Sequence, residues 1–192
     1  MKKQKPIIVI VLLKVAAFAR AVLSLRYKVS IKGVEDLKNA VPVLILPNHQ
    51  ALIDPMIFMS QIYRYSYAIP VISSTFYDIP LAKSVFSSWG AVRVSDLEAG
   101  SRNINVLNEI SRSVLKAFGR DKNVVLYPSG QLAGQGYEKI FNKKSAQKIV
   151  KQMPADVKVV GVRISGLWGS MWSKAKTGKT PSLFAQLLKG MV

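Results

Sequence analysis

Short apolar runs alternate with segments of helical periodicity along most of the chain, and this alternation limits the fold more than any other feature. Continuous apolar runs at 41–46 and 124–126 are typical of strands that are buried on both faces, and 157–164 is predicted to be another strand. Residues 101–118 and 145–152 have the spacing of amphipathic helices. Strands that alternate with helices predict an α/β fold, a layered sandwich in which helices flank a mixed, mostly parallel sheet.

Shorter patterns add further elements. Alternating polar and apolar residues at 27–32 indicate a strand, and 71–72 and 91–94 are short strand candidates. Asp54 and Pro55 predict the start of a helix, with Asp54 as the N-cap and proline at the first helical position. This helix is expected to reach about residue 65.

The first 26 residues form a separate segment. Residues 6–25 contain only two charges, Lys14 and Arg20, over a length that would span a bilayer. A charge near the middle of a span costs roughly 2.5–3.5 kcal/mol, and a helical projection gathers the charges on one arc of about 120°. We therefore expect residues 1–26 to be a helix that lies on the membrane, followed by one domain over 27–192. A helix packed on its own domain and a cleaved signal peptide are the alternatives.

The composition restricts the partners and the chemistry. The formal net charge is +18, which points to a polyanionic partner, either anionic lipid or nucleic acid. The apolar amino terminus and the lack of an aromatic-basic motif favour lipid, so no nucleic-acid partner is expected. The chain has no cysteine and one histidine, which excludes thiol nucleophiles and multi-histidine zinc sites. We expect no metal and no bound cofactor.

The sharpest motif is Asn48-His49 followed by Asp54. On a continuous helix, His49 and Asp54 would point about 140° apart. Because the helix is expected to begin only at Asp54, His49 lies on a strand-to-helix turn, and such a turn can fold the carboxylate back to the imidazole. A carboxylate that fixes the tautomer makes histidine a stronger general base. A plain histidine in a turn, next to a capping aspartate, is the alternative.

This Asn-His-x-x-x-x-Asp motif, after a buried strand and a basic, apolar amino terminus, resembles the glycerophosphate and lysophospholipid acyltransferase family over residues 27 to about 170. The resemblance implies an α/β sandwich whose catalytic turn faces a membrane, with His49 as general base and Asp54 as the residue that orients it. It implies transfer of a fatty acyl group from acyl-CoA or acyl carrier protein to the hydroxyl of a lysophospholipid or glycerophosphate. Membrane lipids are then partners, and the expected location is the cytoplasmic face of the inner or plasma membrane.

Later blocks depart from the family pattern. The second block carries Asp96 where the family has arginine, although Arg93 is nearby. The third block reads Tyr-Pro-Ser-Gly-Gln at 127–131 and lacks the family's glutamate and arginine. In the family the two arginines bind the acceptor phosphate, as bidentate guanidinium groups do. The expected substrate contacts in this chain are Arg93, Ser129, Gly130 and Gln131.

The third block and residues 163–170 resemble a family branch that is often joined to an acyl-activating adenylation domain. An acyl-activating enzyme is therefore one candidate partner. A truncated product, a domain cut from a longer protein and a stand-alone form all remain open. A catalytically weak or inactive relative that binds a membrane or a partner is the alternative function.

Overall fold

The computed structural model describes residues 7–38, 42–80, 82–95, 104–140, 143–182 and 185–186. Within these residues, five strands form one sheet in the order β3-β2-β4-β1-β5, and every strand pair is parallel. The strands are β1 (Val43–Pro47), β2 (Ala68–Ser73), β3 (Val92–Val94), β4 (Asn123–Val125) and β5 (Lys158–Val162). The helices are α1 (Ile7–Ser24), α2 (Glu35–Lys38), α3 (Asp54–Ile62), α4 (Ser74–Tyr77), α5 (Ala82–Trp89), α6 (Ile104–Phe118) and α7 (Ser145–Gln152).

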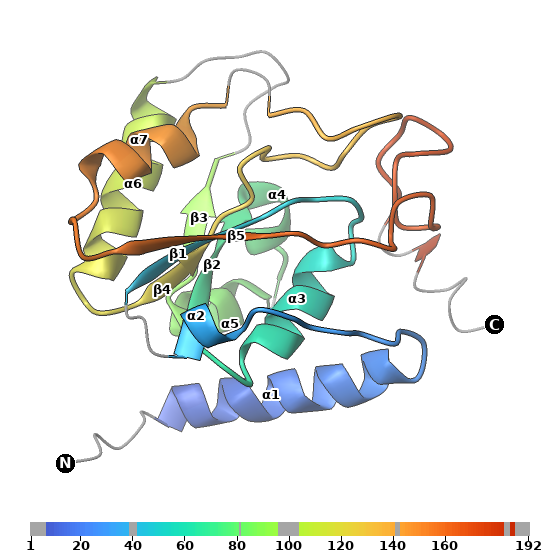
Figure 1. The fold of residues 1–192 in the computed structure, drawn as a ribbon, viewed down its shortest axis with the longest axis horizontal. Helices are drawn as coiled ribbons and strands as arrows, with labels where there is room; N and C mark the ends of the chain where they lie inside the picture. Colours follow the sequence, from blue (N-terminus) through green and yellow to red (C-terminus); the bar gives the residue numbers. More distant parts are fainter. Residues whose placement is uncertain are drawn as a thin grey trace.

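Helices cover both faces of the sheet (Figure 1). On one face α6 and α7 pack over a core that includes Val114 and Ile149. On the other face α3 closes a second core around Ile45 and Ile62. The long helix α1 lies outside this layer and packs against α3 and α5. The predicted α/β sandwich is confirmed.

The position of β1 in the sheet explains its unbroken apolar sequence. Leu44 pairs with Val124 of β4 on one side and with Val159 of β5 on the other. Side chains 43–45 are fully buried, because helices cover both faces of a parallel sheet. β1 ends at Pro47, so the following turn lies at the carboxyl edge of the sheet, where open α/β sheets place their ligand sites.

The strand predicted at 27–32 is wrong. This segment is irregular, and it connects α1 to α2 without pairing with a strand among the described residues. Its apolar residues Val29 and Ile31 are 42% and 37% exposed, so the alternation does not create a buried face. The other predicted elements are present, with bounds that differ by a few residues; α3 ends at Ile62 rather than at about 65.

Helix α1 has two apolar faces. Val9, Leu12 and Ala16 are buried against the domain, whereas an outer row remains exposed. The residues of this outer row are Val11, Val15, Phe18 and Val22, continued by Leu25 in the turn after the helix, and together they are called the α1 stripe below. Within the part of the chain that the structure describes, no helix is long and apolar enough to cross a bilayer. The helix thus packs on its own domain with one face and leaves another apolar face uncovered.

Candidate active site

The structure brings His49 and Asp54 together. His49 lies on the turn that leaves β1, and Asp54 is the first residue of α3. The distance between His49 Nδ1 and Asp54 Oδ2 is 3.2 Å. The Asp54 side chain is fully buried, and the His49 side chain is 15% exposed. The turn has therefore folded the carboxylate back to the imidazole.

Asp54 does not act as the predicted N-cap of α3. The N-cap position is Ile53, and no side chain caps the helix there. The Asp54 carboxylate instead turns back over the preceding residues, where Oδ2 accepts the N–H of Gln50 at 2.6 Å and the N–H of Ala51 at 2.8 Å. These two backbone donors fix the oxygen that contacts His49. A carboxylate in the first turn of a helix is also stabilised by the helix dipole.

Glu138 holds the backbone of His49. Its Oε1 and Oε2 lie 3.0 and 2.9 Å from the His49 nitrogen, whose N–H donates to this carboxylate. Glu138 is 89 residues further along the chain, in a loop that has no regular secondary structure. Periodicity and motif spacing contain no signal for such a contact, and sequence reasoning missed it.

Tyr127 packs against the His49 ring. The ring centroids of His49 and Tyr127 are 4.4 Å apart, with an interplanar angle of 38°. The Tyr127 hydroxyl is buried and has no hydrogen-bond partner among the described residues. Burial raises the pKa of Tyr127 well above its usual value, and the nearby carboxylates of Asp54 and Glu138 raise it further. The tyrosine is therefore neutral beside the histidine.

The third sequence block lies next to the same turn. The Ala133 N–H donates to the His49 carbonyl oxygen at 2.7 Å, which ties this segment to the histidine. Ser129 is fully buried and its hydroxyl donates to the Gln131 carbonyl oxygen at 2.9 Å. Gly130 has a φ of +59°, a left-handed conformation that favours glycine, and its N–H donates to the Tyr127 carbonyl oxygen at 3.0 Å.

A cation lies beside this block. A Cβ at Gly130 would lie 4.0 Å from Cε of Lys143. The Lys143 side chain is exposed. Lys143 is therefore close to the segment in which the family pattern carries an arginine.

Arg93 lies elsewhere. It is on β3, the edge strand that is separated from β1 by β2 and β4. Three strand spacings are roughly 14 Å. Its guanidinium forms an exposed ion pair with Asp78, in which Nε lies 3.0 Å from each carboxylate oxygen. The structure does not bring Arg93 next to His49, and its role as a substrate contact stays a prediction.

Three further hydrogen bonds tie the turn to neighbouring segments. The Asn48 side chain donates to the Ile164 carbonyl oxygen at 3.0 Å and accepts the Ile164 N–H at 2.5 Å, which joins the end of β1 to the segment after β5. The Leu52 N–H donates to the carbonyl oxygen of the buried Trp172 at 2.9 Å. Asn48 thus positions the turn and is not aimed at a substrate.

This arrangement suits general base chemistry. When Nδ1 carries the proton, its N–H donates a hydrogen bond to Asp54, and the lone pair of Nε2 is available to accept a proton from a substrate hydroxyl. The carboxylate also stabilises the imidazolium that forms when the proton is transferred. A hydroxyl that loses its proton in this way becomes a nucleophile.

The comparisons with known proteins identify the family. The sequence model of the acyltransferase family matches residues 28–165, more than two thirds of the chain. The chain belongs to the acyltransferase family, as the motif predicts.

A solved structure shares the fold. The crystal structure of the 1-acyl-sn-glycerophosphate (LPA) acyltransferase PlsC from Thermotoga maritima aligns with a TM-score of 0.59 and 20% sequence identity. The alignment covers 88% of this chain and 63% of that chain, so this chain spans less than two thirds of the length of its structural relative. No curated protein sequence matches the chain.

Proposed function

We propose that this protein transfers a fatty acyl group from an acyl thioester to the hydroxyl of a lysophospholipid or glycerophosphate. The thioester carrier is acyl-CoA or acyl carrier protein. Membership of the acyltransferase family and the PlsC-like fold support the reaction class. The observation that carries the proposal is the His49–Asp54 pair, with the carboxylate oxygen held by two backbone N–H groups.

The reaction needs one proton carrier. His49 Nε2 removes the proton from the acceptor hydroxyl while the hydroxyl oxygen attacks the thioester carbonyl carbon. The tetrahedral intermediate then collapses, the carbon–sulfur bond breaks, and the imidazolium returns the proton to the thiolate that leaves. Asp54 keeps the ring in one orientation through both steps. This direct transfer needs no covalent acyl-enzyme, metal or bound cofactor.

The acceptor phosphate requires cations near the turn. Lys143 lies beside Gly130, and we assign it the role of binding this phosphate in place of the missing arginine. Because the Gly130 N–H already donates to Tyr127, an oxyanion contact falls on the neighbouring N–H groups around Ser129 and Gln131.

Membrane attachment by the α1 stripe would bring this site to its substrates. Exposed apolar rows of this kind mark membrane or protein contacts, and a helix whose lysine and arginine lie outside its apolar row suits the lipid interface. The expected location is the cytoplasmic face of the membrane, where soluble thioester carriers are present. An acyl-activating enzyme stays a candidate partner.

The proposal is tested by acyl transfer with purified protein in mixed vesicles. Labelled acyl-CoA and acyl carrier protein thioesters are offered with glycerol 3-phosphate and a panel of lysophospholipids. We expect turnover that is lost in His49→Ala, and a higher KM for the phosphate-bearing acceptor in Lys143→Ala. If no donor and acceptor pair reacts, while wild type and His49→Ala bind anionic vesicles equally, the protein is an inactive relative that binds membranes.

A further inference from the structure

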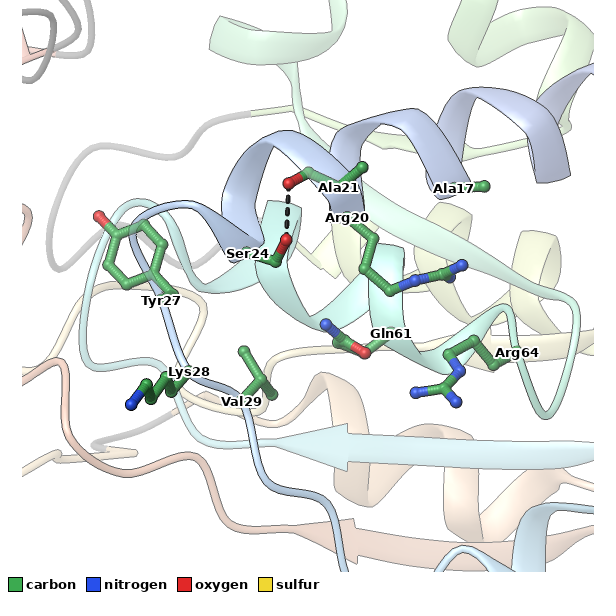
Figure 2. Close-up of a pocket in the computed structure, with 9 residues that line it drawn as sticks. All are labelled: Ala17, Arg20, Ala21, Ser24, Tyr27, Lys28, Val29, Gln61 and Arg64. Carbon is green, nitrogen blue, oxygen red and sulfur yellow. Dashed lines mark hydrogen bonds between the residues drawn. The ribbon is translucent and has the colours of Figure 1, made fainter.

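A second basic site lies between α1 and α3, away from the catalytic turn. Here the two helices and the segment after α1 line a hollow of about 470 Å³ that is open to solvent (Figure 2). Arg20 of α1, Lys28 of the following segment and Arg64 after α3 line it, together with the amide of Gln61. Gln61 is seven residues beyond Asp54, roughly 10 Å along the helix axis.

The charge in this hollow is not balanced. None of its lining residues is acidic. In the part of the chain that the structure describes, neither of the two ion pairs involves Arg20, Lys28 or Arg64. One N–H of Arg20 donates to the Ser60 carbonyl oxygen at 3.2 Å, which holds the guanidinium at the hollow and leaves its other donors available. Three cations and an amide around one space form a receptor for an anion with several oxygens.

The position of the hollow on α1 points to the source of this anion. At 100° per residue, the residues of α1 that line the hollow are centred roughly 130° around the helix from the α1 stripe. If the stripe lies in the acyl region of a bilayer, the hollow lies on the side of α1 that is turned away from the acyl chains and toward the headgroups. A phosphate at that level faces the hollow without any rearrangement of α1.

We propose that this hollow binds the phosphate of an anionic phospholipid as a non-catalytic site that fixes the orientation of the domain on the membrane. The proposal does not depend on the acyl transfer reaction, because none of the hollow's residues contacts His49 or Asp54 in the structure. It differs from general attraction of a basic protein, since it assigns the effect to three named cations.

The test compares two double variants that change the charge equally. Arg64→Glu with Lys28→Glu alters the hollow, and Arg112→Glu with Lys116→Glu alters exposed residues of α6 on the opposite side of the sheet. Partition is measured by co-sedimentation with phosphatidylcholine vesicles that contain 30% phosphatidate. Each cation near an anionic surface contributes about fivefold to binding, so the first variant is expected to lose about twentyfold or more. The α6 variant, beyond the screening length of roughly 8 Å, is expected to lose less than threefold.

Equal losses in the two variants would overturn the proposal, because only net charge would then matter. Thermal unfolding of each variant shows whether the fold is retained, and Arg64→Gln provides a milder change with an expected loss of about fivefold. Soluble dihexanoyl phosphatidate and inorganic phosphate are compared by calorimetry. Tighter binding of the lipid, lost in Arg64→Gln, supports the site; equal binding of inorganic phosphate would overturn the assignment to a lipid.

Discussion

At the scale of single residues, the site depends on one carboxylate oxygen. Asp54 Oδ2 contacts the His49 ring and accepts two backbone N–H groups from the turn between them. Hydrogen bonds to a charged group contribute about 1.5–3 kcal/mol each, so the turn stabilises the carboxylate and the carboxylate stabilises the turn. Tyr127 and Glu138 complete the surroundings from a distant part of the chain.

Glu138 is a positioning residue, and its replacement is expected to affect turnover more than substrate binding. In Glu138→Ala the His49 N–H loses its acceptor, so we predict a fall in kcat of about tenfold with KM within twofold. Glu138→Gln keeps an acceptor oxygen and is expected to stay within threefold of wild type. Steady-state kinetics on the three proteins measures this. Equal losses in both variants would show that the negative charge matters rather than the hydrogen bond.

Because of Tyr127, the free energy of unfolding is expected to decrease at alkaline pH. The unfolded tyrosine ionises near pH 10, whereas burial keeps the folded one neutral. Its stabilising effect is complete below pH 10 and decreases above it, by about 1.4 kcal/mol per pH unit. Tyr127→Phe is expected to remove this part of the slope. Because it also removes a buried hydroxyl without a described partner, we expect little loss of stability at pH 7. Denaturant unfolding of wild type and Tyr127→Phe between pH 7 and 11 tests both the pH slope and the stability at pH 7. If the fall in stability above pH 10 is the same in the two proteins, Tyr127 is not its cause.

At the scale of elements, the sequence predicts what local patterns encode. The buried strands β1 and β4 have continuous apolar runs, the half-exposed edge strand β5 is rich in valine, and α6 and α7 have clear helical periodicity, so all five are found where they are expected. The segment 27–32 has the alternation of a strand, but strand pairing depends on a free sheet edge, which the local sequence does not report. The contact of Glu138 with His49 also cannot be predicted from local sequence patterns, because it depends on how a long loop folds back.

The α1 stripe is expected to contribute to membrane binding without contributing to the stability of the domain. Phe18 and Val22 are 72% and 49% exposed. Each apolar side chain taken fully from water is worth about 1.5–3 kcal/mol, so Phe18→Ser with Val22→Ser should weaken partition into vesicles by about a hundredfold or more. The free energy of unfolding of this double variant should be unchanged.

Leu12→Ser is the matched control on the same helix. Leu12 is 6% exposed and faces the domain, so this change is expected to lower the free energy of unfolding by about 2–4 kcal/mol. Co-sedimentation and thermal unfolding separate the two effects. Loss of stability in the Phe18 and Val22 variant would mean that the stripe packs on protein.

At the scale of the whole molecule, the catalytic domain and the amino-terminal helix are distinct parts. The match to the acyltransferase family begins at residue 28, after α1, and ends at 165. It therefore includes the whole sheet and the turn that carries His49. α1 adds an exposed apolar row and a basic hollow to this core, and the net charge of +18 favours an anionic surface. The proposed roles in catalysis and in membrane attachment thus fall on different segments.

The central claim is that His49 acts as a general base that Asp54 orients. Its most direct test is kcat/KM for acyl transfer in wild type, His49→Ala, Asp54→Asn and the double variant, each shown to be folded. A positioned general base contributes about 10²–10⁴-fold, so His49→Ala should lose at least a hundredfold. Because the two residues act as a unit, the double variant should be no slower than His49→Ala. Activity of His49→Ala within tenfold of wild type would contradict the account.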